Sequence, residues 1–364
     1  MKTIIRCVLC GLLACFTAAC SAPKKNTEQP ELHKDNMKIA YLVTHLGDKS
    51  YCDSGEAGMN RLREEGYDVT TYEIGEDPSG FRANIMTAID QNCNLILGNS
   101  NFLETLDEIA REHPEVRFVL IDVKREPEEL LDNQAAVFYA QNEGSYLIGV
   151  LSAAITESGT VAIDVGKDVP VIGDFVAGFV NGVKDWNAAN GTDVKVVSGT
   201  VGSWSDPSSM KAICLDQAKN SHADVFYQVA GGSGDGLFEA CVQTDSWAIG
   251  VDSDQYQAYM DAGQPRKAEV ILTSMIKEVG NSLINTVYAI DNKEDIWKKT
   301  KTLGLAEESV GYVDNENYQK HVPAKVRKAL LESAANITAR RISVKSYYDF
   351  KDHNEYQEYL KSAQ

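Results

Sequence analysis

The chain has 364 residues, with 53 acidic side chains against 35 Lys and Arg, which gives a formal net charge of −18 at pH 7. So acidic a composition argues against nucleic acid or anionic lipid as a partner, because both are bound by clustered Lys and Arg. Beyond the first 36 residues the remainder is too long for one small core, and its length predicts two lobes.

The chain begins with a pattern that is typical of secretory signal peptides. Lys2 and Arg6 precede an apolar run over 8–16, and the small residues Ala18 and Ala19 follow it. A basic start, a short apolar stretch and a small-residue cleavage site define such signals. The apolar stretch is shorter than the roughly 20 residues that a membrane-spanning helix needs. We therefore expect 1–19 to be a signal peptide that is removed.

Cys20 directly follows this cleavage site. The arrangement resembles the bacterial lipobox, in which the Cys is acylated and becomes the new N-terminus, although Thr17 stands where Leu is usual. The alternative is ordinary signal cleavage that leaves a spare thiol. Residues 21–36 are polar and lack periodicity, which predicts a flexible tether after the lipidated Cys20. We expect a lipid-anchored protein on the cell membrane that faces the periplasm or the cell exterior.

Four further cysteines lie in the part that is expected to fold: Cys52, Cys93, Cys214 and Cys241. They are far apart and form no C-x-x-C pair, so the sequence predicts neither a metal site nor a disulfide framework. No cofactor is expected. A single disulfide between Cys214 and Cys241 is left open.

Short apolar runs alternate with amphipathic stretches from residue 38 onward. Continuously apolar runs between helices predict parallel strands that are covered on both faces. In the first half we expect strands at 38–44, 67–74, 94–98 and 117–122, with helices over 57–65, 81–90 and 102–112. In the second half we expect strands at 160–166, 194–200, 224–231 and 246–252, with helices near 170–189, 206–220 and 234–244.

The remaining segments define the expected lobe boundaries. The run 135–139 and a helix over 142–155 are expected to form the crossover between the lobes, and 269–274 opens a helix over 275–289. Lobe 1 is expected to hold 37–141 and 271–298, and lobe 2 to hold 142–270 and 299–364. The predicted fold class is α/β, with two doubly wound lobes, a hinge and an interlobe cleft.

Candidate site residues are sought at the strand ends, because ligands of open α/β sheets bind beyond the carboxyl ends of the strands. Carboxylates accept hydrogen bonds from sugar hydroxyls, lysine donates to them, and aromatic rings stack on planar groups. Together such residues predict a neutral polyhydroxylated ligand with a planar ring. Taken singly, a strand-end Asp can be a helix N-cap, and a tyrosine or lysine can be a packed or solvated side chain. The candidates are His45, Tyr51, Cys52, Asp122, Tyr227, Gly232, Asp252 and Lys277.

Six stretches carry a resemblance to a known family, and they run in the family's order between about residues 38 and 314. The stretches are DKSY (48–51), QNEGSYLIG (141–149), AGFVNGVK (177–184), QVAGG (228–232), IGVDSDQ (249–255) and LTSMIK (272–277). With them the chain resembles the basic membrane protein family of bacterial ABC-transporter substrate-binding lipoproteins, which includes treponemal purine nucleoside receptors.

The resemblance implies a class I periplasmic-binding fold that captures nucleosides, in particular purine ribonucleosides, and delivers them to an ABC permease. It implies that Tyr51 and Tyr227 sandwich the base and that Asp122 reads the base edge. It also implies that Asp252 and Lys277 hold the ribose hydroxyls. Two departures lie on the base-reading side: Cys52 stands where the treponemal pattern has Asn, and His45 is the nearest match to an Asp.

Three alternatives are kept beside this interpretation. A receptor for a free sugar such as ribose shares the fold and the paired aromatics. An enzyme that cleaves the nucleoside glycosidic bond is disfavoured, because the chain has no G-x-S-x-G, no H-E-x-x-H and no aspartate cluster suited to Ca²⁺. Cys52 near His45 is a weak nucleophile–base candidate. A surface antigen without a ligand is the third alternative. We expect a binding protein, not an enzyme.

Overall fold

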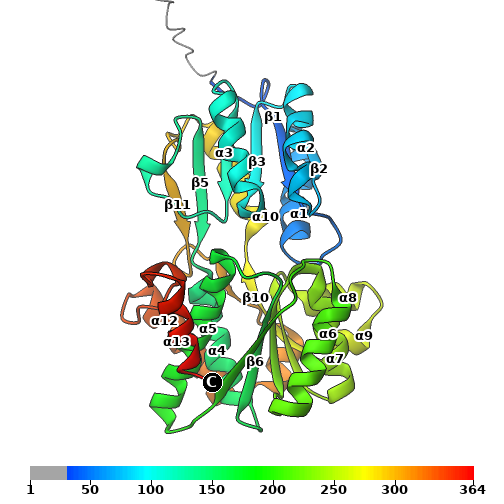
Figure 1. Cartoon of the computed structure of the whole chain (residues 1–364), viewed down its shortest axis with the longest axis vertical. Coiled ribbons are helices and arrows are strands. Elements are labelled where there is room, and N and C mark those ends of the chain that lie inside the picture. The colour runs from blue at the N-terminus through cyan, green and yellow to red at the C-terminus, as the bar shows by residue number, and fades with distance from the viewer. Residues whose placement is uncertain (1–30) are drawn as a thin grey trace, which may run out of the picture.

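The chain folds into two α/β lobes, which lie one above the other in Figure 1. The structure is a computed structural model that describes residues 31–364. The expected signal peptide, Cys20 and most of the expected tether therefore lie outside the described residues. Within 31–364, each helix is either too short or too polar to cross a lipid bilayer.

The first lobe is built on a six-stranded sheet with the order β11-β5-β4-β3-β1-β2. All of its neighbouring strands are parallel. Its strands are β1 (Lys38–Val43), β2 (Asp68–Glu73), β3 (Leu95–Asn99), β4 (Arg117–Ile121), β5 (Gln134–Tyr139) and β11 (Thr300–Leu303). Its helices are α1 (Tyr51–Glu64), α2 (Pro78–Asp90), α3 (Leu103–Glu112) and α10 (Val279–Asp291), with short 3-10 turns at Ser100–Phe102 and Pro127–Glu129.

The second lobe repeats this plan with the order β12-β10-β9-β8-β6-β7, except that β12 is antiparallel to β10. Its strands are β6 (Thr160–Val165), β7 (Lys195–Thr200), β8 (Val225–Val229), β9 (Trp247–Asp252), β10 (Ile271–Lys277) and β12 (Val310–Tyr312). Its helices are α4 (Gln141–Ile155), α5 (Pro170–Asn190), α6 (Pro207–Asp216), α7 (Asp235–Thr244), α8 (Gln255–Asp261), α9 (Pro265–Ala268), α11 (Glu316–His321), α12 (Ala324–Thr338) and α13 (His353–Lys361), with short turns at Gln217–Ser221, Gly231–Gly234 and Tyr347–Asp349.

The chain passes between the lobes near 140, 278 and 304, and this corrects the expected boundaries. The segment 271–298 is not one piece of lobe 1, because β10 pairs with β9 in the second sheet while α10 packs on α1 in the first lobe. β11 pairs with β5 and so extends the first sheet instead of belonging to lobe 2. The run expected as a crossover, 135–139, is strand β5 itself.

The core follows from the alternation of side chains along each strand. In β1, Ile39 and Tyr41 face the cluster that contains Met59 of α1, whereas Ala40 and Leu42 face the helices on the other side of the sheet. Burying one large apolar side chain contributes about 1.5–3 kcal/mol. Helices on both faces thus hold each sheet rigid, which fixes the strand ends that carry the site.

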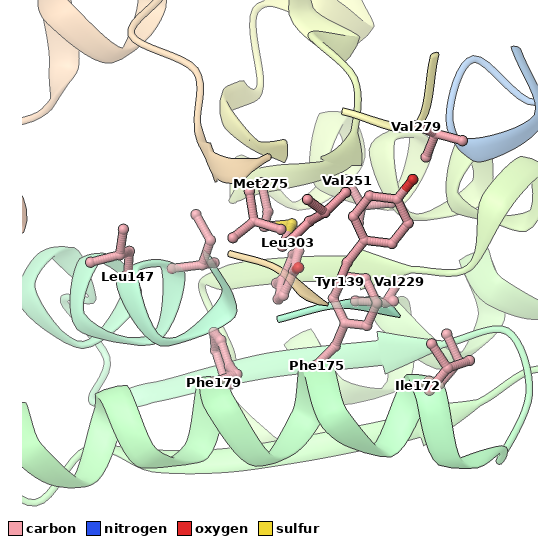
Figure 2. Packing of buried hydrophobic residues seen from close by; sticks show 14 of the residues in the cluster. Tyr139, Leu147, Ile172, Phe175, Phe179, Val229, Val251, Met275, Val279 and Leu303 are labelled. Carbon is pink, nitrogen blue, oxygen red and sulfur yellow. The ribbon is translucent and has the colours of Figure 1, made fainter. Parts of the chain in front are cut away.

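The core of the second lobe reaches up to the cleft. Figure 2 shows Ile172 and Phe175 directed from α5 toward Val229 of β8 and Val251 of β9. The four cysteines within 31–364 are buried and free, so the disulfide left open between Cys214 and Cys241 is not formed.

Candidate ligand-binding site

A cavity lies between the lobes, at the carboxyl ends of the parallel strands of both sheets. Its volume is about 670 Å³ with the open solvent at its mouth included. Lobe 1 contributes side chains that follow β1, β3 and β4. Lobe 2 contributes the ends of β8, β9 and β10, the start of α5 and the loop between β7 and α6.

Asp122, Asp252 and Lys277 form what we call the charged floor of this cavity. Asp122 follows β4 in lobe 1, whereas Asp252 and Lys277 are the last residues of β9 and β10 in lobe 2. Lys277 Nζ lies 2.5 Å from Asp122 Oδ2, so this ion pair joins the lobes. Asp252 Oδ2 accepts a hydrogen bond of 2.6 Å from Ser50 Oγ. The other carboxylate oxygen of Asp122 has no hydrogen-bond partner within 31–364 and can accept one from a ligand.

One expectation about the floor needs correction. Lys277 was expected to enter the cleft from a helix, but residues 275–277 continue strand β10, and the helix begins at Val279. Asp122, which the resemblance assigns to the base edge, lies in contact with Lys277 of the expected ribose pair.

The floor combines unusual backbone with strong burial. Asp122 and Asp252 have φ values of 62° and 66°, in the left-handed region that Asp tolerates better than most residues. Such residues cost on the order of 1–3 kcal/mol and are concentrated at functional sites. Burial raises the pKa of Asp252 to about 6, against the opposing effects of Lys277 and Ser50. Burial likewise raises the pKa of Asp122, although the Lys277 ammonium acts to lower it.

Among the described residues, Tyr51, Phe175 and Trp204 bring large aromatic rings to the cavity, beside the smaller imidazole of His45. Lys277 Nζ lies 5.3 Å from the centroid of the Tyr51 ring and 5.0 Å from that of Phe175, at cation–π distances. These two rings therefore adjoin the charged floor. Trp204 reaches the cavity from the loop between β7 and α6, and its Nε1 donates a hydrogen bond of 3.2 Å to Asn101 Oδ1 of lobe 1.

Tyr227 does not line the cavity, so the expected sandwich by Tyr51 and Tyr227 is wrong in its second member. The Tyr227 ring is fully buried and packs 5.7 Å from Phe179, and its hydroxyl lies 3.2 Å from Ser145 Oγ. Tyr227 is two residues short of the carboxyl end of β8. Val229, which ends that strand and faces the same side, is the residue that reaches the cavity.

His45, Cys52 and Gly232 lie in the cavity wall. A Cβ on Gly232 would lie 3.2 Å from the Trp204 carbonyl oxygen and 3.5 Å from His45 Nε2, so a glycine lets these groups approach. The Cys52 thiol lies 3.6 Å from Thr44 Oγ1, and burial raises its pKa far above the usual range. Cys52 is therefore a neutral, weakly polar part of the wall, which removes the basis for a nucleophilic role.

The loop before α1 is held by one carboxylate. Asp48 accepts hydrogen bonds from the backbone N–H groups of Ser50 and Cys52, each at 2.9 Å, and of Asp53 at 3.1 Å. These bonds satisfy the free N–H groups at the start of a helix. The Lys49 carbonyl, at the same edge of the cleft, accepts from Ser253 Oγ at 2.7 Å and from Gln255 Nε2 at 3.0 Å in lobe 2.

Sequence reasoning missed Ser50, Asn101, Phe175 and Trp204. Trp204 could have been found by the rule already in use, because it stands four residues after the end of β7. Asn101 likewise follows β3 closely. Phe175 carries no such signal: it lies within an apolar helix and looks like an ordinary core residue.

Comparison with known proteins identifies the family. Residues 38–346 match the family described as ABC transporter substrate-binding protein PnrA-like. The ABC transporter nucleoside-binding protein BmpA of Lactococcus lactis is 29% identical over 266 residues, which cover 68% of this chain and 73% of the relative. Basic membrane protein A of Borreliella afzelii is 25% identical over 302 residues, which cover 82% and 87%. The CD4+ T-cell-stimulating antigen of Listeria monocytogenes is 28% identical over 306 residues, which cover 79% and 83%.

Solved structures agree on the fold. An ABC transporter solute-binding protein from Aeropyrum pernix K1 superposes with a TM-score of 0.77 at 23% identity, over 90% of this chain and 98% of that chain. A second one, from Conexibacter woesei, superposes with a TM-score of 0.67 at 17% identity, over 85% and 99%. The fold class predicted from the sequence, the class I periplasmic-binding fold, is thereby confirmed. The chain belongs to the PnrA-like family of ABC transporter substrate-binding proteins, which bind their substrates and are not enzymes.

Proposed function

We propose that the protein captures nucleosides, and purine ribonucleosides in particular, for an ABC importer. The observation that carries the proposal is the charged floor beside the aromatic rings of one cavity between the lobes. A carboxylate can accept from two neighbouring ribose hydroxyls, and an ammonium can donate to them. Bonds to charged partners are stronger than neutral ones. A flat base can lie against Tyr51, Phe175 or Trp204. The Lactococcus lactis relative is a nucleoside-binding protein by name, which supports this ligand class.

The charge of the floor narrows the ligand further. Two carboxylates face one lysine, so the floor carries a net negative charge when all three groups are ionised. Hydroxyl donors are favoured there, whereas a phosphate is repelled. Inosine is therefore expected to bind more tightly than its 5′-monophosphate.

Calorimetric titration tests the sugar contacts. Inosine should bind at least ~100-fold more tightly than 2′,3′-dideoxyinosine, since each lost contact to a charged group is worth about 1.5–3 kcal/mol. Asp252→Asn should reduce this difference by roughly tenfold, because its amide oxygen still accepts from a hydroxyl but no longer carries a charge. Asp254→Asn is the matched control, because Asp254 caps α8 and is not among the cavity residues. Equal curves for inosine and the dideoxy analogue would contradict the proposal, and tighter binding of free ribose than of inosine would favour a sugar receptor.

We further propose that a lipid on Cys20 anchors the protein to the cell membrane. The support is the sequence pattern of 1–20, which the structure does not describe. Cys20→Ser should abolish incorporation of labelled palmitate and release the protein from membranes. Cys15→Ser, within the apolar stretch, is the control and should leave the labelling intact.

A further inference from the structure

Glu76, Lys167, Trp204 and Ser205 meet at the solvent-exposed side of the cleft, which we call its mouth. The Glu76 carboxylate is bound there by three groups from the opposite lobe. Glu76 lies in lobe 1, on the loop between β2 and α2. Its Oε2 lies 2.9 Å from Lys167 Nζ and accepts a hydrogen bond of 3.2 Å from the backbone N–H of Trp204. Its Oε1 accepts one of 2.8 Å from Ser205 Oγ. All three donors belong to lobe 2, so these bonds exist when the lobes are together.

We propose that Glu76 is a positioning residue that holds Trp204 over the cavity when the lobes close, and so sets the rate at which the ligand leaves. The inference rests on the proposed function for the chemical class of the ligand. Glu76 itself is not among the residues that line the cavity. It acts through Trp204, which does line the cavity.

The loop that carries Trp204 is fixed firmly to lobe 2, so the ring moves with that lobe. Ser233, which is fully buried, donates its backbone N–H to the Trp204 carbonyl at 3.0 Å. Ser233 Oγ also donates to the Ser203 carbonyl at 2.9 Å and accepts from the Asp206 N–H at 2.8 Å. The indole packs so closely on Gly166 that a Cβ there would lie 2.4 Å from the ring.

Lobe 1 therefore holds Trp204 at two points. Glu76 binds the backbone of the loop, and Asn101 accepts a hydrogen bond from the indole Nε1. Breaking either contact frees one side of the ring while its attachment to lobe 2 stays intact. A ligand beneath the ring can leave only when the lobes separate enough to break both contacts.

The ion pair is accessible enough to open and close. The side chains of Lys167 and Glu76 are 28% and 21% exposed. Burial acts to raise the pKa of Glu76, but the bonds from Lys167, Ser205 and Trp204 outweigh it and lower the pKa. Glu76 is therefore ionised throughout the neutral range. Changes at such contacts act mostly on dissociation rates.

Stopped-flow fluorescence with inosine tests the proposal. Glu76→Ala should release inosine roughly tenfold faster and leave the association rate within about threefold, since related variants differ mainly in dissociation. Glu56→Ala is the matched control: Glu56 is 18% exposed and pairs with Arg63 at 2.6 Å, but both residues lie in α1 of lobe 1. Glu76→Lys should also speed release, and the charge-swapped double variant with Lys167→Glu should still release inosine faster than the parent, because a lysine at position 76 cannot accept from the Trp204 N–H or Ser205 Oγ.

A distance measurement without nucleoside separates this inference from the proposed ligand class. Spin labels on Glu108→Cys and Lys219→Cys, which are exposed positions of lobes 1 and 2, report the opening of the cleft. Glu76→Ala should shift their separation toward longer distances. If the shift occurs but inosine does not bind to the parent protein, the ligand class is wrong and the positioning role stands. If inosine binds and Glu76→Ala changes neither its release nor the separation, the positioning role is overturned.

Discussion

The floor and the mouth of the cleft each hold a lysine–carboxylate pair that joins the two lobes. The side chains of Lys277 and Asp122 at the floor are 2% and 7% exposed, whereas those of Lys167 and Glu76 at the mouth are 28% and 21% exposed. A buried pair pays a large desolvation penalty and is costly to break on one side. A solvated pair is worth only about 0–1 kcal/mol. The same chemistry can therefore shape a binding site at the floor and regulate opening at the mouth.

The largest expected effect is on folding stability, at the floor. Asp122→Asn keeps a residue that tolerates the left-handed backbone but removes the carboxylate in contact with the Lys277 ammonium and leaves only Asp252 of the charged floor as a counter-charge. We expect a loss of about 3 kcal/mol in the free energy of unfolding by urea, at the lower end of the ~3–5 kcal/mol for breaking a buried pair, because the amide oxygen still accepts. Glu76→Ala should lose less than about 1 kcal/mol. Equal losses at the two sites would show that their difference in burial does not matter.

The next effect concerns the ring at the mouth. Stacking of a base on an aromatic side chain is worth about 1–3 kcal/mol in single-stranded nucleic-acid complexes. Trp204→Ala should therefore weaken inosine binding by roughly tenfold or more, with about 1.4 kcal/mol per decade.

The matched control for that ring is a buried one. Tyr227→Leu, which removes the ring, should leave the inosine affinity of the folded protein within about twofold, because that ring packs on Phe179 and does not line the cavity. Calorimetry that finds binding weakened in Tyr227→Leu and unchanged in Trp204→Ala would restore the sandwich expected from the sequence.

The contrast between floor and mouth also explains what could be predicted from the sequence. Asp122, Asp252 and Lys277 could be placed in the cleft because the carboxyl ends of parallel strands meet at one edge of a sheet. Tyr227 was placed in the site by the resemblance, whereas β8 ends at Val229 and so leaves its ring below the strand end.

The features that could not be predicted from the sequence are contacts between segments that are far apart in the chain. The pair between Asp122 and Lys277 joins residues that are 155 positions apart. Whether β10 adds to the first or the second sheet depends on where the chain crosses between the lobes, and periodicity does not report this. For the same reason, nothing in the sequence indicated that Glu76 has a role. A carboxylate in a polar loop has no distinguishing pattern until the fold places the opposite lobe against it.

The smallest expected effect is a pH dependence, in which the floor changes its protonation state and the mouth does not. The pKa of Asp252 is raised to about 6, whereas that of Glu76 is lowered. Between pH 7.5 and pH 5 the floor therefore loses an acceptor while the mouth stays ionised. Only about one-tenth of Asp252 is ionised one unit below its pKa, so inosine affinity should fall by up to about tenfold at pH 5.

Stability of the ligand-free protein should change in the opposite direction over the same window. A group whose pKa is raised by folding contributes stability that is fully present below its unfolded pKa and is lost as the pH rises through its folded pKa. Asp252 therefore stabilises the free protein on acidification through pH 6 while inosine affinity declines. Asp252→Asn should flatten the affinity profile but only reduce the slope of the stability profile, because burial also raises the pKa of Asp164 to about 7 and that of Asp174 to about 6. The faster release in Glu76→Ala should persist at pH 5. Titrations and urea unfolding at pH 5, 6 and 7.5 measure both, and an affinity that stays constant down to pH 5 would show that the ionised Asp252 does not hold the ligand.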